Sequence, residues 1–236
     1  MASVSFQANT VKGFRFWDEA GLIANKYVDR FRAINYGNIP QTLVCAAPSD
    51  PGDYMMELRV SPYNIWIAYR AMVSWVTVRQ ETSRDVAWIA RAIDVTQFSR
   101  LGLRVSLLWH GQDREHVVNT LLSQALNVHE QDWAQVGRAT GGELVVHLEH
   151  DKLAVRLWMS PVVNVRREQH VTIPGSEPPP HMEEEILPDF AISVDADLAD
   201  TRITESVDVM PHLNRSVKYL QESLIPFISR MLEQEH

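Results

Sequence analysis

The 236-residue sequence contains a single cysteine, Cys45, and this scarcity excludes two kinds of site. One thiol forms neither an internal disulfide nor a multi-thiolate metal centre, which agrees with a reducing compartment. Cys45 lies in the apolar run 43–47, where a free cysteine behaves as a small hydrophobic residue. Because a catalytic thiol needs an electropositive and partly exposed setting, we expect Cys45 to have a structural role.

Long apolar runs are missing as well. No stretch approaches the roughly 20 residues needed to cross a bilayer. Residues 1–14 lack the charged head and apolar core of a secretory signal. We therefore expect a cytoplasmic protein with no membrane contact. Because 45% of the residues are hydrophobic and 22% are charged, the chain is expected to bury a core of its own.

Lysine is also scarce, since 18 of the 22 basic residues are arginine. Arginine suits planar recognition of carboxylate or phosphate, although a genomic base-composition bias produces the same pattern and is the favoured explanation. The net charge of -8 divides unevenly. Residues 1–112 carry 12 basic and 9 acidic residues, whereas residues 113–236 carry 10 and 21. This acidic second half disfavours general nucleic-acid binding but allows a local arginine patch on the first half.

Hydrophobic periodicity predicts an α+β fold. Alternating apolar and polar residues predict a half-buried strand at 54–61, and β-branched and aromatic residues predict strands at 65–69 and 73–79. A strand at 101–109 could be covered on both faces, and further strands are predicted at 4–11, 143–149, 153–159 and 190–194. Apolar spacings of three and four predict helices at 17–33, from Thr82 to residue 95, and from Asp113. Thr82 and Asp85 resemble a capping box at the start of the second helix.

The predicted elements form two similar sheet-plus-helix halves. Each half reads strand, helix, antiparallel meander, helix, with domains at 1–99 and 100–236. A duplication is possible as a pattern of elements, because residue-level identity between the halves is weak. Residues 174–188 combine prolines with concentrated acid, so we expect an exposed acidic loop there.

The last predicted helix, 207–232, has the strongest periodic signal, and Pro211 suits its first turn. Its apolar residues are separated by 4, 3, 4, 3 and 4 positions: Leu213, Val217, Leu220, Leu224, Phe227 and Met231. A repeat shorter than three heptads favours a helix that packs on a sheet. An interaction surface for a protein partner or a homodimer remains the alternative. Pro226 should kink or interrupt the last turns.

Two groups of side chains could bind a metal ion. Asp195 and Asp197 at a predicted strand end, with Asp200 nearby, supply carboxylates of the kind that Mg²⁺ uses, although any acidic surface supplies the same residues. His147, Glu149 and His150 belong to a predicted hairpin in which His150 falls in the turn, so they do not form the helical H-E-x-x-H arrangement. The sequence contains no Walker loop, nucleophile elbow or dinucleotide fingerprint, and we expect no cofactor.

The first half is rich in tryptophan. If several of these residues share a sheet face with Arg70, Arg79 and Arg104, they could stack bases or anchor a protein partner. Packing in the core is the favoured interpretation for most of them. The tryptophans concerned are Trp17, Trp66, Trp75, Trp88 and Trp109.

The string Arg100-Leu101-Gly102-Leu103-Arg104-Val105 follows a predicted strand at 75–79 and a predicted helix at 84–95. With the late Asp195 strand and the long C-terminal helix 207–232, this order resembles a sporadically distributed, uncharacterised bacterial family. The resemblance spans most of the chain and implies no catalytic residues. The scattered occurrence of the family implies an accessory role, for example in mobile elements or phage defence.

Three functional hypotheses follow. The absence of a catalytic motif and the periodic C-terminal helix favour a non-enzymatic accessory protein that binds a protein partner or a second copy. The first alternative is a metal-dependent enzyme that acts on phosphoesters through Asp195, Asp197 and Asp200. The second is single-stranded nucleic-acid binding by the first half, although the net charge makes nucleic acid a disfavoured partner.

Overall fold

The structure is a computed structural model. It describes residues 3–11, 13, 15–36, 41–50, 52–70, 73–125, 141–163, 190–202, 204 and 207–232. The chain divides into two compact units. Unit 1 comprises Met1–Leu107, Val146–Leu157 and Asp195–Ile228, and unit 2 comprises Leu108–Val145, Trp158–Val194 and Ser229–His236.

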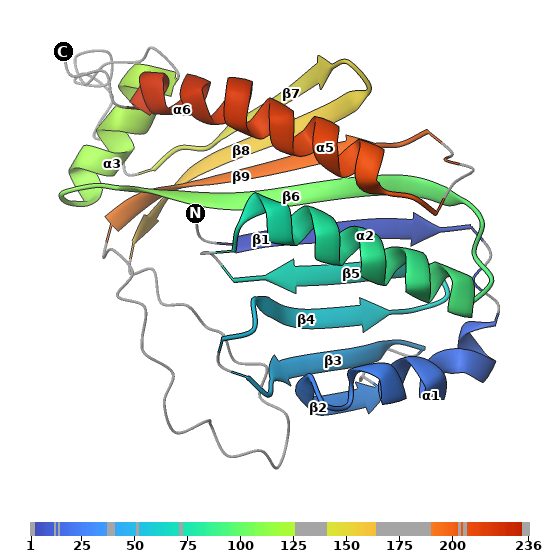
Figure 1. The fold of residues 1–236 in the computed structure, drawn as a ribbon. Coiled ribbons are helices and arrows are strands. Elements are labelled where there is room, and N and C mark those ends of the chain that lie inside the picture. The colour runs from blue at the N-terminus through green and yellow to red at the C-terminus, as the bar shows by residue number, and fades with distance from the viewer. Residues whose placement is uncertain are drawn as a thin grey trace. The chain divides into compact units, whose positions relative to one another are not determined.

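The predicted α+β class is confirmed. Nine antiparallel strands form one sheet in the order β2-β3-β4-β5-β1-β6-β9-β8-β7 (Figure 1). Unit 1 contains residues from each of these strands. The strands are β1 (Ser3–Thr10), β2 (Phe31–Tyr36), β3 (Leu43–Pro48), β4 (Met55–Val60), β5 (Asn64–Tyr69), β6 (Phe98–His110), β7 (Leu144–His150), β8 (Leu153–Val163) and β9 (Phe190–Asp200).

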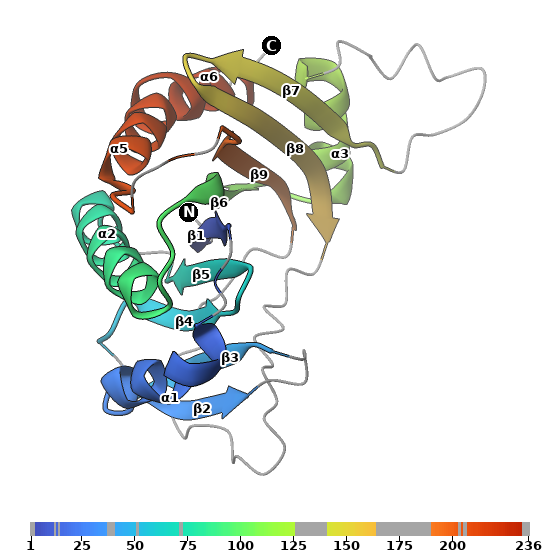
Figure 2. The same ribbon diagram turned by 90° about the vertical axis from the view of Figure 1, so that its right-hand side faces the viewer.

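In unit 1, helices α1 (Phe16–Tyr27), α2 (Trp75–Ala92) and α5 (Met210–Tyr219) lie on the same face of the sheet (Figures 1 and 2). The π-helical turn η2 (Leu220–Leu224) and helix α6 (Ile225–Leu232) continue α5. In unit 2, helix α3 (Arg114–Thr120) begins after Asp113 and continues into the π-helical turn η1 (Leu121–Ala125). None of the helices described is both long enough and apolar enough to span a membrane.

The helix-facing side of the sheet forms the core of unit 1. Strand register aligns one fully buried side chain from each of five neighbouring strands: Cys45, Leu58, Ile67, Phe6 and Leu103. Cys45 is therefore a core residue, as its apolar surroundings in the sequence predicted. Burial raises the pKa of its thiol to about 12, which keeps the thiol protonated at neutral pH.

Helix α2 corrects one prediction. Residues 73–79 were expected to form a strand, but the helix already begins at Trp75 and Ser74 is its N-cap, accepting a hydrogen bond from the Thr77 N–H at 3.1 Å. Thr82 and Asp85 do not cap the helix, because both lie in its interior with their side chains buried.

The end of α1 corrects a second prediction. A helix was expected over 17–33, but α1 stops at Tyr27 and Phe31 opens strand β2. Phe31 is buried, and its strand pairs with β3 in antiparallel register. Packing against the neighbouring strand therefore outweighs the helical periodicity that continues past residue 27.

The order of elements agrees with the two-half pattern. The first stretch reads β1-α1-β2-β3-β4-β5-α2 and the second reads β6-α3-β7-β8-β9-α5 over its described residues. In the sheet, β5 lies beside β1, β9 lies beside β6, and β1 pairs with β6. Unit 1 takes strands from both stretches, so the domain boundary at 99 and 100 and the duplication stay predictions. The predicted acidic loop 174–188 lies outside the described residues.

Candidate functional site

Asp195, Asp197 and Asp200 lie on β9 rather than beyond its end, because the strand runs to Asp200. Asp195 accepts hydrogen bonds from Arg104 Nε at 2.8 and 2.9 Å, and Asp197 accepts one from Arg100 Nη2 at 2.6 Å. Both arginines come from the neighbouring strand β6. Two of the carboxylates proposed as metal ligands therefore face guanidinium groups.

Asp200 has arginine partners of its own. Its buried carboxylate accepts a hydrogen bond from Arg202 Nε at 2.9 Å and forms an ion pair with Arg215 at 3.2 Å. The hydrogen bonding by Arg202 is the main cause that lowers the pKa of Asp200. In the described part of the chain, no three His, Cys, Asp or Glu side chains are grouped so that they could hold a metal ion. The metal hypothesis gains no support from this geometry.

In the second metal candidate, alternation along β7 places His147 and Glu149 on one face of the strand and His150 on the other. His147 and Glu149 alternate with apolar residues on β7, and His150 ends the strand. The His150 ring stacks on Tyr219 of α5, with centroids 4.5 Å apart and planes 28° apart. His150 is therefore engaged by an aromatic ring.

Next to Asp200 lies a buried histidine that sequence analysis did not single out. His212 on α5 is 2% exposed, and its Nε2 lies 3.3 Å from Ser216 Oγ. Its Nδ1 has no hydrogen-bond partner among the described residues. Burial and, second, the charge of Arg215 lower the pKa of His212 to about 4. Because Ser216 is also fully buried, the pair belongs to the core and does not form an accessible catalytic dyad.

The C-terminal helix buries most of its predicted seam. Four of the six apolar residues are core residues of unit 1: Leu213, Val217, Leu220 and Leu224. Of the two alternatives left open by the sequence, this burial supports a helix that packs on a sheet. A role for the seam in binding another chain stays a prediction.

The phase of this seam changes at the π-helical turn η2. A π-helical turn inserts one residue relative to an α-helix, and Pro226, which has no backbone N–H, follows this turn in the first turn of α6. After η2 the fully buried residue is Ile228, whereas Phe227 is 49% exposed and Met231 is half-buried. Phe227 is therefore the most accessible residue of the predicted interaction set.

The tryptophans of the first half do not gather on one sheet face. They are distributed over two helices and two strands: Trp17 on α1, Trp75 and Trp88 on α2, Trp66 on β5 and Trp109 on β6. Arg79 also lies on α2, where it donates hydrogen bonds to the Trp75 carbonyl and to Asn214. The arrangement proposed for base stacking is therefore not formed by this set.

One surface does collect polar and aromatic side chains, on the face of the sheet opposite α1, α2 and α5. We call it the polar sheet face. Its members belong to five adjacent strands of unit 1, β4, β5, β1, β6 and β9. They are Gln7, Asn9, Glu57, Arg59, Trp66, Arg100, Arg104, Asp195 and Asp197.

Strand register aligns the centre of the polar sheet face. Arg59 lies opposite Trp66, Trp66 opposite Gln7, and Gln7 opposite Gly102. The Arg59 guanidinium lies 4.8 Å from the centroid of the Trp66 ring and also pairs with Glu57. Cation–π contact and ion pairing together fix the orientation of Arg59.

Gly102 has a steric role at this face. A Cβ atom placed on it would lie 2.7 Å from Arg100 Nη1, so the Arg100 guanidinium occupies the space above the glycine. From there it reaches Asp197. The string Arg-Leu-Gly-Leu-Arg thus places two arginines on one face of β6, with room between them for one guanidinium to lie flat.

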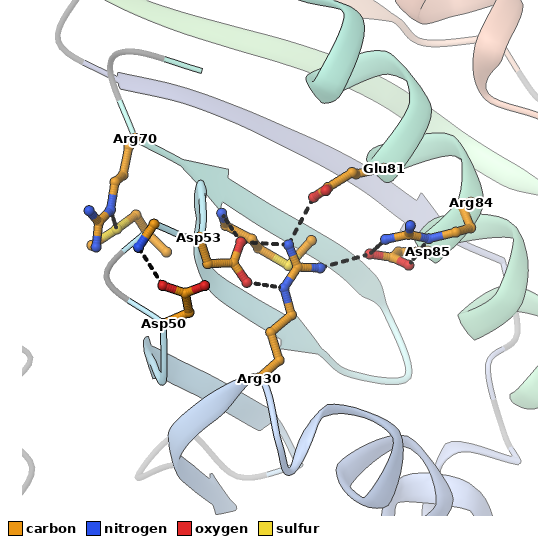
Figure 3. A network of polar contacts seen from close by, with 10 residues as sticks. Arg30, Asp50, Asp53, Arg70, Glu81, Arg84 and Asp85 are labelled. Atoms are coloured by element: carbon orange, nitrogen blue, oxygen red, sulfur yellow. Dashed lines mark hydrogen bonds and ion pairs between the residues drawn. The ribbon is translucent and has the colours of Figure 1, made fainter. Parts of the chain in front are cut away.

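A second polar cluster joins three segments of unit 1 on the helix side (Figure 3). Arg30 precedes β2 and donates to Asp53 through two N–H groups, one of them at 2.7 Å, and to Glu81 at 2.9 Å. Asp85 lies 3.7 Å from Arg30 and accepts a hydrogen bond from Arg84 at 2.9 Å. Asp53 precedes β4, and Glu81 and Asp85 belong to α2.

The arginines and carboxylates of this cluster, which we call the arginine cluster, pair with one another. Burial disfavours the charged form of Arg30, but hydrogen bonds to Asp53 and Glu81 outweigh it and raise the Arg30 pKa. Burial likewise acts against the Asp53 carboxylate, and bonding to Arg30 more than offsets it, so that the Asp53 pKa is lowered. Asp85 is 1% exposed at its side chain and has two arginines nearby. The cluster joins α2 to the segments that precede β2 and β4, and each of its three carboxylates accepts a hydrogen bond from a guanidinium group.

Sequence analysis missed this cluster because its members come from segments that meet only in the folded chain. One signal was present. Asp85 follows Val78 and Thr82 by seven and three positions and precedes Ile89 by four, so it lies on the apolar face of α2. A carboxylate at an inward-facing position requires a buried partner, and an arginine is the expected one.

Comparisons with known proteins give no indication of the function of this chain. No protein-family model, no curated protein and no solved structure matches the chain. The resemblance to an uncharacterised bacterial family therefore stays a prediction, and the functional proposal depends on the geometry of the chain alone.

Proposed function

We propose that this protein is a non-enzymatic accessory protein that binds a protein partner through the polar sheet face. The main support is the combination of Arg59, Trp66, Arg100 and Arg104 on a face opposite the three helices of unit 1. Arginine and tryptophan are enriched in protein interfaces and are frequent hot spots of binding energy. A role in phage defence remains an expectation from the resemblance.

The charge balance of this face favours protein over nucleic acid. Three arginines, Arg59, Arg100 and Arg104, are accompanied by three carboxylates, those of Glu57, Asp195 and Asp197, so the local net charge is zero. Nucleic-acid binding depends on an excess of positive charge that neutralises phosphates. A balanced, hydrogen-bonding surface instead suits the mixed charges of another protein.

The arginines are also preorganised. Arg59 is held by Trp66 and Glu57, Arg100 by Asp197, and Arg104 by Asp195. Immobilising a long side chain on binding costs about 0.5–1.5 kcal/mol. Because these side chains are already ordered, a partner would find donor groups in fixed positions at a smaller entropic cost.

Site-specific photocrosslinking tests this proposal. Benzoylphenylalanine would replace Gln7 at the centre of the polar sheet face, with the exposed Gln80 on α2 as a matched control position. In cells of the source organism, we expect a discrete adduct from position 7 that proteinase removes and nuclease does not, and none from position 80. The captured protein, once purified, should bind the wild type and lose affinity for Trp66→Ala.

The outcomes separate the alternatives. A nuclease-sensitive adduct at position 7 would support the nucleic-acid hypothesis instead. Equal adducts at positions 7 and 80, or none at either, would contradict the proposed interface. For the metal-dependent enzyme, a thermal-shift screen with Mg²⁺, Mn²⁺ and Zn²⁺ is decisive, because specific binding to the folded state must raise its melting temperature.

A further inference from the structure

Strand β7 is the last strand of the sheet order, and no described strand pairs with its outer edge. Within unit 1 it contributes residues 146–150, of which His147, Leu148, Glu149 and His150 are exposed. Leu148 is 37% exposed, which is unusual for a leucine within a strand of this sheet. The edge therefore offers backbone hydrogen-bonding groups together with an apolar side chain.

Soluble proteins usually protect such an edge with lysine, proline or a bulge. Residues 144–150 contain no lysine, arginine or proline. At the opposite edge of the sheet, β2 carries the exposed Arg32, whose guanidinium bonds the Ser49 carbonyl of the neighbouring strand end. Edge β7 thus lacks a basic residue of the kind that edge β2 has, and an edge without lysine, arginine or proline favours pairing with another strand.

The backbone of β7 presents alternate residues to the free edge. Two turn residues separate His150 from Leu153 in the β7–β8 hairpin. Because the residues that flank a two-residue turn form a hydrogen-bonded pair, we infer that the backbone groups of His150 and Leu148 point toward β8. Those of His147 and Glu149 consequently point away from β8. The side chains of His147 and Glu149 also share one face of the sheet, because they are two positions apart.

We propose that β7 pairs with β7 of a second copy, antiparallel about a two-fold axis at Leu148, to form one sheet that is continuous across both copies. In this register His147 lies opposite Glu149 of the second copy, and the same pair recurs on the other side of the axis. In all four residues of these two pairs the backbone N–H and C=O groups point away from β8, as hydrogen-bonded positions of the new strand pair require. The two Leu148 side chains meet at the axis on the opposite face.

Hydrogen-bond complementarity selects this register and this occupant. A shift of the axis by one residue, to His147, would place His147 opposite itself and Glu149 opposite Val145. The register centred on Leu148 instead forms two imidazole–carboxylate pairs, in which an imidazole N–H donates to a carboxylate. A strand whose side chains complement themselves about a two-fold axis fits an identical copy, as isologous interfaces require. This surface differs from the polar sheet face, and the proposal does not depend on the function proposed above.

Sedimentation velocity of the purified full chain tests the proposal by exchanging the histidine and the glutamate. We expect the wild type to sediment with about twice the 27.0 kDa chain mass. His147→Glu and Glu149→His should each shift the equilibrium at least tenfold toward monomer, because each single change places like residues opposite each other. The double variant His147→Glu/Glu149→His restores complementarity and should recover the dimer. Glu222→His, an equivalent change at an exposed position on η2, should leave it unchanged.

A disulfide tests the register. Leu148→Cys places two thiols opposite each other at the axis, at a Cβ separation that a disulfide can span. Mild oxidation should therefore give a covalent dimer for Leu148→Cys and not for Val146→Cys, while the buried Cys45 stays reduced. Circular dichroism and a thermal melt establish that each variant is folded. A wild type that stays monomeric at every concentration, or a dimer that the single variants do not weaken, would overturn the proposal.

Discussion

The arginine cluster makes a quantitative prediction about stability. Arg30→Ala would leave the carboxylates of Asp53 and Glu81 without their shared cation, and Asp85 with Arg84 as its remaining arginine partner. Removing one partner from a buried ion pair costs about 3–5 kcal/mol. Because the Arg30 side chain is 21% exposed, we expect a cost near the lower limit, about 3 kcal/mol.

Urea unfolding at pH 7 measures this loss. With a slope of about 3 kcal/mol per molar urea, the midpoint should fall by about 1 M. The matched control is Arg15→Ala, which removes an arginine that is 56% exposed from an i,i+4 pair with Glu19. Exposed pairs of this kind contribute about 0.3–0.5 kcal/mol, so the control midpoint should barely move.

The pH dependence separates an electrostatic effect from a packing effect. The folded protein lowers the pKa of Asp53, so the stability from that carboxylate is present above its unfolded pKa of about 3.9 and is lost as pH falls through the folded value. Without Arg30 the carboxylates gain protons more easily. The difference between Arg30→Ala and wild type should therefore shrink from pH 7 to about pH 4.5. A difference of equal size at both pH values, or one no larger than that of Arg15→Ala, would refute the reasoning.

Three further predictions concern buried groups. The pKa of His212 is about 4 in the folded protein and about 6.5 in the unfolded chain. Between pH 7 and pH 5 this residue should therefore cost the wild type about 2 kcal/mol of stability. The His212→Leu variant should not show this loss, which urea midpoints at the two pH values measure. Cys45 should resist Ellman's reagent in the native protein and react fully in urea. Ile228→Ala should cost about 2–4 kcal/mol, whereas Phe227→Ala should cost less than about 1 kcal/mol.

Each of these predictions has a clear contrary result. An unchanged pH slope in His212→Leu would mean that the histidine is not buried in its neutral form. Rapid labelling of native Cys45 would place the thiol at the surface. Equal costs for the Ile228 and Phe227 variants would mean that the uninterrupted heptad phase of the sequence, rather than the phase after η2, describes the helix.

Much of the sheet could be predicted from sequence because most strands have one covered and one polar face. The strands predicted at 54–61 and 101–109 correspond to β4 and β6, and Leu58 and Val60 are buried as expected. At the start of β4 the register shifts between Met55 and Glu57, so Met55 is buried in place of Met56. The prediction was wrong at 73–79, where β-branched and aromatic residues have high strand propensity but form the first turns of α2. Ser74 was the local signal for a helix start. Because Thr82 and Asp85 resemble a capping box, the helix start was placed there instead.

The candidate site shows which information the sequence does not contain. Two-residue alternation placed Asp195 and Asp197 on one face of a strand, and this is correct. Whether those carboxylates are free to bind a metal ion or are paired with arginine depends on the strand that lies beside β9. No local sequence pattern predicts the order of strands. Because that neighbour is β6, Arg104 meets Asp195 directly, while Arg100 reaches Asp197 across the space that Gly102 leaves open. The same five-residue string that suggested a family likeness therefore has a physical role, since a side chain at Gly102 would separate the second pair.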